Sequence, residues 1–285
     1  MALVDANHLL ASAERQGFSL CAFELPDPSL ADAVLSGAEA AKSPVILEVN
    51  DAMALEGILP IVEASARCST VPVAIWCHTD SVDQAVRAIN LGCNGIYCES
   101  EQVAAVARGC GVAVAKPGEN IAIIRHINSL ARAATERCLK TSGKADYMGL
   151  MNSVQEAVRD EAARCLHEAG SNGRAPTVLS ECPIWSTVEH CIIYYIDVDE
   201  EESPVAEALM SEGRRALAKI PGVREVITGR AVTSDAQYRY CWIIKFVHPA
   251  VIDSFRDHPD HVKFADAHFR PIASDRISID FERIE

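Results

Sequence analysis

Four histidines in the last third of the chain are placed where an imidazole can do acid–base chemistry. His190 opens the apolar run EHCIIYYI, and His258 and His261 belong to the run HPDHVKF. His261 and His268 lie seven residues apart, on one face of a predicted helix with Phe264. An imidazole in a half-apolar pocket titrates near neutral pH and can move protons. The alternative is structural: the His-Pro pair caps the helix, and His261 makes one buried hydrogen bond.

Another histidine, His78, follows the apolar run VPVAIW and therefore lies at the carboxyl end of a predicted strand. Active sites of barrels built from parallel strands gather at that end, and Asp80 and Glu99 are candidates to join it. His78 is a candidate metal ligand, with a remnant polar residue as the alternative. His258 and His261, three residues apart, are a second candidate pair for a metal.

The eleven cysteines do not point to chemistry. Their number is odd, they are scattered along the chain, and no two have CxxC spacing. We interpret them as reduced, mostly buried, small hydrophobic residues in a reducing compartment.

The elements that position His78 alternate between apolar strands and helices of about ten residues. Strands are predicted at 19–25, 44–49, 71–76, 95–98 and 111–115, and helices at 5–16, 29–41, 54–66, 82–91, 101–108 and 147–169. This alternation predicts βα units and a parallel sheet with helices outside. The stretch 121–140 reads either as a strand IAIIRHIN or as the opening of a long helix.

Beyond residue 186 the order becomes strand, helix, strand, strand, helix, strand, which is the ferredoxin-like arrangement. The strands are predicted at 189–196, 222–229, 238–247 and 277–282, and helical segments at 204–219, 249–256 and 261–268. We therefore predict an α/β domain at 1–175, a polar linker at 176–185 and an α+β domain at 186–285.

The second domain is predicted to pair with a copy of itself. Its first and third strands, 189–196 and 238–247, carry apolar side chains on both faces, whereas its helices can cover one face. At about 25 cal/mol per Å² of apolar area, a wet second face would cost several kcal/mol. Twofold packing of sheet on sheet removes that exposure. The alternative is that the first domain covers this face.

Charge and hydropathy exclude several partners. With 26 basic and 40 acidic residues the net charge is −14, so no nucleic acid is expected. No apolar run approaches the roughly 20 residues that span a bilayer, so no membrane partner is expected. The N-terminus shows no signal-peptide pattern, and a cytoplasmic location is the expectation. The net charge does not exclude a local basic pocket that binds a small phosphate.

The segment 186–285 resembles the Dabb family, the stress-responsive dimeric α/β-barrel domain. The residues that carry the likeness are VEH at 188–190, IPGV at 220–223, GR at 229–230, 240–246, HPDHVKF at 258–264 and IDF at 279–281. The family includes polyketide cyclases, which perform intramolecular aldol condensations with a set of histidines and a tyrosine. His190 and His261 match that set, while Tyr240 replaces its third-strand histidine and Phe255 its tyrosine.

This resemblance implies roles for residues of the second domain. His190, Tyr240 and His261 are the catalytic candidates. The candidates for binding substrate are Trp242, Phe255 and His258.

The first part resembles class II fructose-bisphosphate aldolases, which are zinc-dependent TIM barrels. The likeness lies in residues 1–25, 43–47, 71–75, 83–100 and 151–175, and in 127–132, which is similar to the family's last strand and includes the candidate substrate ligand Asn128. The family needs an Asp-His pair after the third strand, a Glu and two later His ligands. Here Cys77 precedes His78, and the stretch for the later ligands is missing between Ala115 and Ile121. We therefore expect a shortened, partial TIM barrel.

Two functional hypotheses follow. In the first, the chain is a dimeric, aldolase-like binding or scaffold protein that has lost zinc-dependent aldol cleavage, with no cofactor expected. In the second, the pocket around His190, Tyr240, Trp242 and His261 performs acid–base, aldol-type closure or cleavage on a small carbonyl compound. A variant of the second keeps a residual aldolase with zinc at His78.

Overall fold

The computed structural model describes residues 2–25, 27–50, 55–116, 121–142, 147–196, 203–233, 235–273 and 275–282. The chain divides into two compact units, the first made of Met1–Ala104 with Val112–Trp185 and the second of Ser186–Glu285 with Ala105–Gly111. Each unit is described by itself. No helix among the described residues is both long enough and apolar enough to cross a bilayer.

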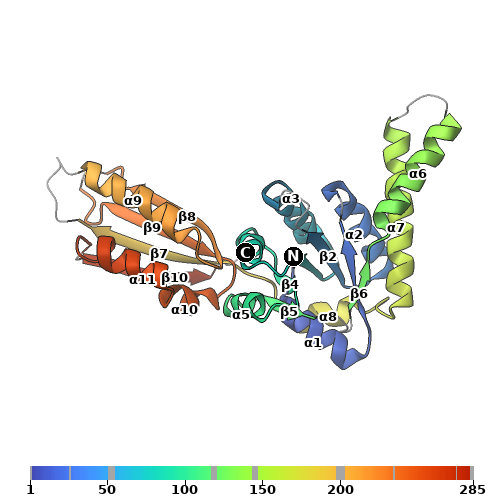
Figure 1. Cartoon of the computed structure of the whole chain (residues 1–285), viewed down its shortest axis with the longest axis horizontal. Helices are drawn as coiled ribbons and strands as arrows, with labels where there is room; N and C mark the ends of the chain where they lie inside the picture. Colours follow the sequence, from blue (N-terminus) through green and yellow to red (C-terminus); the bar gives the residue numbers. More distant parts are fainter. Residues whose placement is uncertain are drawn as a thin grey trace. The chain divides into compact units, whose positions relative to one another are not determined.

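The first unit is built on a parallel sheet that curls into half a barrel (Figure 1). Its six strands lie in the order β5-β4-β3-β2-β1-β6. The strands are β1 (Leu20–Glu24), β2 (Val45–Asn50), β3 (Val73–His78), β4 (Gly95–Tyr97), β5 (Ala113–Ala115) and β6 (Ile121–Ile124). β1, β2 and β3 are buried along almost their whole length, as their near-continuous apolar sequence predicts. The predicted βα architecture and partial barrel are confirmed.

Helices lie on both sides of this sheet. They are α1 (Ala6–Gln16), α2 (Ala31–Ala41), α3 (Leu55–Cys68), α4 (Val82–Asn90), α5 (Glu101–Gly109), α6 (Ile127–Ser142), α7 (Tyr147–Glu168) and α8 (Ala175–Glu181). α2, α3 and α7 pack against β1, β2 and β3 (Figure 1). Residues of α1 and α8 join a second core on the other face, with Leu20, Ala22, Ile46 and Trp76. We call this the inner face of the sheet. Because side chains alternate between the two faces of a strand, every second residue after these four also lies on the inner face.

One close approach fixes the position of Trp76 on the inner face. A Cβ atom on Gly95 would lie 2.2 Å from the indole ring, so the ring can pack there because the neighbouring strand β4 begins with glycine. Trp76 is opposite Gly95 in the register of β3 and β4. This packing leaves the indole nearly fully buried.

Two segments of the first unit differ from the sequence prediction. The last strand is Ile121–Ile124, and the stretch 127–132 that resembles a strand is the start of α6. Only Arg125 and His126 separate the apolar strand from the helix, so composition alone does not show the boundary. The segment 176–185, predicted as a linker, begins within α8, and Val178 and Cys182 are buried in the core. A proline in the first turn of α8 starts this short helix.

The second unit has an antiparallel sheet in the order β10-β7-β9-β8. Its strands are β7 (Val188–Tyr195), β8 (Val223–Arg230), β9 (Tyr240–Phe246) and β10 (Asp275–Glu282), and its helices α9 (Ser203–Leu217), α10 (Val251–Arg256) and α11 (Pro259–Phe264), followed by a π-helical turn η3 (Ala265–Phe269). The predicted ferredoxin-like order is confirmed.

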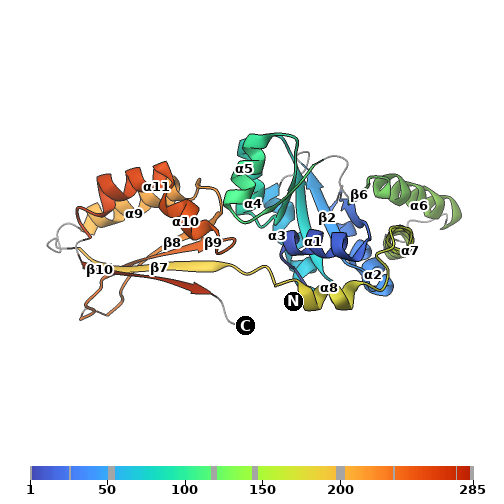
Figure 2. The same ribbon diagram turned by 90° about the horizontal axis from the view of Figure 1, so that it is seen from below.

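Within this unit the helices lie on one side of the sheet (Figure 2). The side that faces them carries His190, Tyr194, Trp242, Ile244 and Phe246, which alternate along β7 and β9 and pair across them. The opposite side, here called the outer face, exposes large apolar side chains on β7 and β10. Their relative exposure is 39% for Ile193, 40% for Tyr195, 41% for Ile277, 47% for Ile279 and 49% for Phe281.

Candidate functional site

A layer of polar groups crosses the carboxyl edge of the half-barrel, where sequence reasoning placed His78 with Asp80 and Glu99 as candidate neighbours. Glu24 of β1 pairs in register with Glu48 of β2, which pairs with Trp76 of β3. Glu48 is 3% exposed. Among the described residues, the Oε2 atom of Glu48 and the Nε1 atom of Trp76 have no hydrogen-bond partner. Buried polar atoms without partners are rare in folded proteins, so this layer is a candidate place for a bound polar group.

The surroundings of Glu48 make its carboxyl group a candidate proton carrier. Burial raises the pKa of Glu48 to about 7, the nearby Glu24 raises it further, and Arg125 opposes the shift. Glu24 itself accepts a hydrogen bond from the Asn50 Nδ2 atom at 2.7 Å and lies 3.4 Å from the Arg125 Nε atom. A carboxyl group with a pKa near neutral can both donate and accept a proton.

His78 does not have the surroundings that a catalytic zinc needs. It is half-buried at the end of β3, and its ring meets the edge of Tyr97 at a centroid distance of 5.0 Å. The Asp80 carboxylate accepts the backbone N–H groups of Ser100 and Glu99, which lowers its pKa and ties it to the loop before α5. Catalytic zinc takes three protein ligands. In the described part of the chain, no cluster of three ligating groups includes His78, so these residues do not fit zinc.

Asn128, a predicted substrate ligand, lies in the first turn of α6 rather than on a strand. Its side chain is outside the described residues.

In the second unit, the structure brings His190 and His261 next to the same aromatic ring, that of Phe255. Phe255 lies 6.3 Å from the ring centroid of His190 and 4.4 Å from that of His261. The Nδ1 atom of His190 is 2.7 Å from the Asp280 carboxylate, which pairs with it across β7 and β10. A carboxylate at Nδ1 orients the imidazole ring.

The surroundings of His261 favour the neutral form of its imidazole. Its Nδ1 atom lies 3.0 Å from the backbone carbonyl of Arg256, and an acceptor there places the ring proton on Nδ1 and the lone pair on Nε2. Burial lowers the pKa of His261, the hydrogen bond to the carbonyl of Arg256 opposes this, and Arg270, His190 and His258 lower it further. The ring is therefore suited to accept a proton through Nε2.

The cavity beside His261 is smaller than a substrate. It has a volume of about 30 Å³ and is lined by Ile192, Leu217, Trp242, Ile244, His261, Phe264, Ala265 and Phe269. A cavity of that size holds about one water molecule. Of the predicted site residues, Trp242 and His261 line it. The acid–base hypothesis predicted a closed, ligand-sized pocket touching His261, and aromatic side chains fill most of that space.

Tyr240 and Trp242 take structural positions. The Trp242 Nε1–H group donates to the Tyr194 hydroxyl at 3.0 Å, and both side chains are buried. Tyr240 stacks on Tyr194 at 5.7 Å and lies opposite it in the register. Because His190 is opposite Ile244, four residues along β9, Tyr240 is about 13 Å from it along the strand.

His258 also has a structural role. Its Nδ1 atom accepts the backbone N–H of Asp260 at 3.2 Å and so caps α11, whose first residue is Pro259. This is the structural alternative that the sequence offered for the His-Pro pair.

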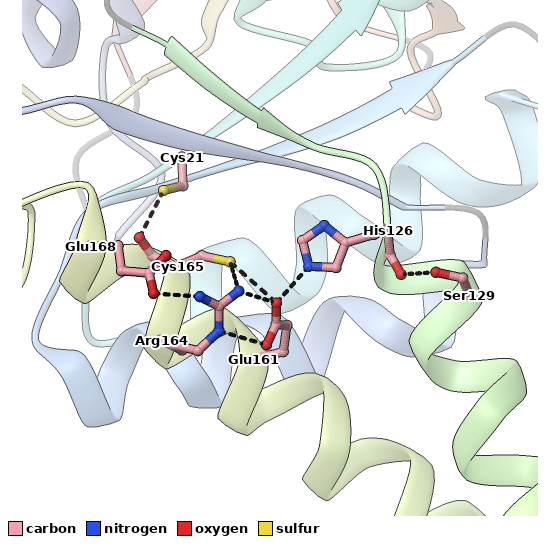
Figure 3. Close-up of polar contacts among 7 residues, drawn as sticks. All are labelled: Cys21, His126, Ser129, Glu161, Arg164, Cys165 and Glu168. Atoms are coloured by element: carbon pink, nitrogen blue, oxygen red, sulfur yellow. Dashed lines mark hydrogen bonds and ion pairs between the residues drawn. The ribbon is translucent and has the colours of Figure 1, made fainter.

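A third cluster was missed by sequence reasoning. His126, just before α6, lies 2.5 Å from the Glu161 carboxylate through its Nε2 atom, and Arg164 bonds the same carboxylate (Figure 3). Arg164 and His126 lower the pKa of Glu161 to about 2, with Arg164 the larger influence. The Cys165 Sγ atom is 3.7 Å from Glu161, and burial together with Glu161 raises the thiol's pKa to about 11. The spacing of Glu161 and Cys165 along one helix was visible, but the approach of His126 depends on the fold.

Comparisons with known proteins match both units. Residues 188–283 match the family model of the stress-responsive A/B barrel domain, Dabb. Residues 4–107 match the model of class II fructose-bisphosphate aldolase. An aldolase-like domain and a Dabb domain are both present.

The chain is also similar to individual known proteins. A sulfofructosephosphate aldolase of Alkalicoccus urumqiensis is 29% identical over 97 residues, 32% of this chain and 34% of that protein. The chain thus spans about a third of the length of the curated relative it matches. The YdjI aldolase of Escherichia coli K12 has 15% identity and a TM-score of 0.43, and the alignment covers 61% of this chain and 99% of that one. A Dabb family protein with a ferredoxin-like fold from Mesorhizobium loti has 20% identity and a TM-score of 0.32, with coverage of 35% and 99%.

Proposed function

We propose that this chain is a homodimeric small-molecule-binding protein whose two copies pair through the outer face of the Dabb sheet. The observation that carries the dimer is the set of five large apolar side chains exposed there on β7 and β10. The helices of the unit lie on the other side of the sheet and cannot cover them (Figure 2). A second copy of the same face, related by a twofold axis, covers them and is covered in turn.

The energy available supports this pairing. Fully burying an Ile, Leu or Phe side chain contributes roughly 1.5–3 kcal/mol, so each half-exposed side chain has about 1 kcal/mol still to gain. In a twofold interface every residue counts twice. The outer face also carries an ion pair of 2.7 Å between Lys245 on β9 and Glu225 on β8, at the edge of the sheet farther from β10.

A matched pair of variants tests the dimer. Ile279→Glu puts a carboxylate in the middle of the exposed stripe, and Ile61→Glu puts one at an equally exposed isoleucine on α3, with exposures of 47% and 52%. We expect Ile279→Glu to weaken the dimer by more than about 100-fold, because each interface would bury two unpaired charges. Light scattering coupled to size exclusion should show Ile61→Glu unchanged. Two variants with the same mass as the wild type would contradict the proposed interface.

The aldolase-like unit is proposed to bind a small carbonyl or phosphate compound without zinc-dependent aldol cleavage. The unpartnered Glu48 and Trp76 atoms at the carboxyl edge support binding, and the isolated position of His78 supports the loss of cleavage. Purified chain supplied with zinc should cleave neither fructose bisphosphate nor sulfofructose phosphate. Cleavage that His78→Ala abolishes would refute this part of the proposal and would leave the dimer untouched.

Acid–base, aldol-type chemistry in the Dabb unit is a second candidate. The contact of His190 with Asp280 and the position of His261 beside a cavity favour it. It requires the aromatic lining to move, because the cavity holds about one water molecule. A small ketone added to the chain should then shift the NMR signal of the His261 ring in the wild type and not in Phe264→Trp, which fills the cavity. Equal shifts in both, or none, would count against this candidate.

A further inference from the structure

We propose that His126, Glu161 and Cys165 form a zinc site that fastens the last strand of the half-barrel to α7. Among the described residues, this is the one group of three ligating side chains whose donor atoms all lie within 4.8 Å of one another. The site is separate from the functions proposed above, and it does not involve His78.

The positions of the three donors follow from the fold. Glu161 and Cys165 are four residues apart on α7, so they project from one face of that helix. His126 comes directly after β6, at the turn into α6, and α6 packs along α7. Figure 3 shows the imidazole and the thiol approaching the same carboxylate from different sides. The Nε2 atom of His126 is 2.5 Å and the Sγ atom of Cys165 is 3.7 Å from one oxygen of Glu161.

The donor set selects the metal. One nitrogen, one carboxylate oxygen and one sulfur suit a borderline-soft ion, whereas Mg²⁺ and Ca²⁺ take oxygen ligands. Zinc bonds to these donors at about 2.0–2.3 Å. The donor atoms already lie within 4.8 Å of one another, so small side-chain movements bring all three within bonding distance of one ion. Three protein ligands leave the fourth tetrahedral position for a water molecule or another ligand. When the Zn–S bond forms, the thiol S–H bond breaks and its proton goes to solvent.

Arg164 would be a hydrogen-bond partner of the ligand Glu161 and not itself a zinc ligand. Its Nε atom donates to the Glu161 Oε2 atom at 2.9 Å, and a second nitrogen donates to Glu168. Zinc on Oε1 would displace the Arg164 Nη2 atom, which donates to Oε1 at 2.5 Å and to the Cys165 Sγ atom at 3.7 Å. The bond to Oε2 would stay and would orient the carboxylate as an outer-shell partner of the metal.

The location sets this site apart from the end of β3. β3 and β6 are separated by β2 and β1, which is three strand spacings or about 14 Å. The proposed zinc would join β6, an edge strand of four residues, to the longest helix of the unit. β1 is tied to the same place, because the Cys21 thiol donates to the Cys165 carbonyl at 3.6 Å.

Cobalt titration of the full chain tests the site. After treatment with chelator, the wild type should bind one Co²⁺ per chain with a thiolate-to-cobalt charge-transfer band, and zinc should displace it. Cys165→Ser should abolish the band. His126→Gln changes an exposed side chain and should weaken binding by more than about tenfold without affecting the fold. The control Cys68→Ser removes an exposed thiol on α3 and should bind like the wild type.

Each other result overturns the proposal. Absence of stoichiometric cobalt binding would do so, as would binding that is unchanged in both Cys165→Ser and His126→Gln. Binding lost in His78→Gln but kept in His126→Gln would place the metal at the end of β3 instead. Circular dichroism of each variant distinguishes lost binding from lost folding.

Discussion

The buried carboxyl of Glu48 makes the stability of the first unit depend on pH. In Glu48→Gln the acid is replaced by a neutral amide of nearly the same shape. Burial raises the pKa of Glu48 from an ordinary 4.5 to about 7, so the folded chain binds this proton more tightly than the unfolded chain does. The contribution of the bound proton to stability is therefore complete below about pH 4.5 and is lost as the pH rises to about 7.

The size of the effect follows from the shift. One pKa unit corresponds to about 1.4 kcal/mol, so the shift corresponds to a loss on the order of 3 kcal/mol between acid and neutral pH. The amide in Glu48→Gln cannot ionise, so the variant does not lose this free energy as the pH rises. We expect Glu48→Gln to match the wild type near pH 4 and to exceed its free energy of unfolding by on the order of 3 kcal/mol near pH 8.

Urea unfolding of both chains across this pH range measures the difference. Glu136→Gln, at an exposed position on α6, is the matched control and should give a difference near zero at every pH. A Glu48→Gln chain that is no more stable near pH 8, or a gain that does not change with pH, would refute the buried, proton-binding description of Glu48.

Two further predictions concern the Dabb unit. Tyr194→Phe removes the acceptor of the buried Trp242 N–H group and should lower the free energy of unfolding by about 1–3 kcal/mol. Tryptophan fluorescence in urea measures this change, and Tyr240→Phe should lower the free energy of unfolding less. Equal effects of the two variants would contradict the assigned hydrogen bond. His258→Ala removes the cap of α11 and should cost about 0.5–2 kcal/mol, with His258→Asn recovering most of it, and a loss that Asn does not restore would argue against capping.

The fold was largely predictable because each element has a clear local signal. Near-continuous apolar runs that alternate with helical patterns located the parallel sheet, and the order of strands and helices beyond residue 186 located the antiparallel one. The errors lie where local signals conflict. Two residues, Arg125 and His126, separate β6 from α6. α8 lies in a segment rich in Gly, Ser and Pro, where the burial of Val178 and Cys182 is evident only from the fold.

The candidate sites were less predictable because they depend on contacts between strands and helices distant in sequence. The single acid in the apolar run PVILEV marks Glu48 in the sequence. Its role as a candidate site residue becomes evident only when the sheet places it between Glu24 and Trp76. His126 comes from the turn before α6, Glu161 and Cys165 come from α7, and the three share no sequence motif. In the Dabb unit, the sequence placed Tyr240 beside His190, whereas the strand register separates them.

Sedimentation equilibrium of the full chain at micromolar concentration tests the central claim most directly, because the outer face of the Dabb sheet must be covered by a second copy. The account predicts a species with twice the 30.8 kDa mass of one chain. A single species of 30.8 kDa across the concentration range would contradict it.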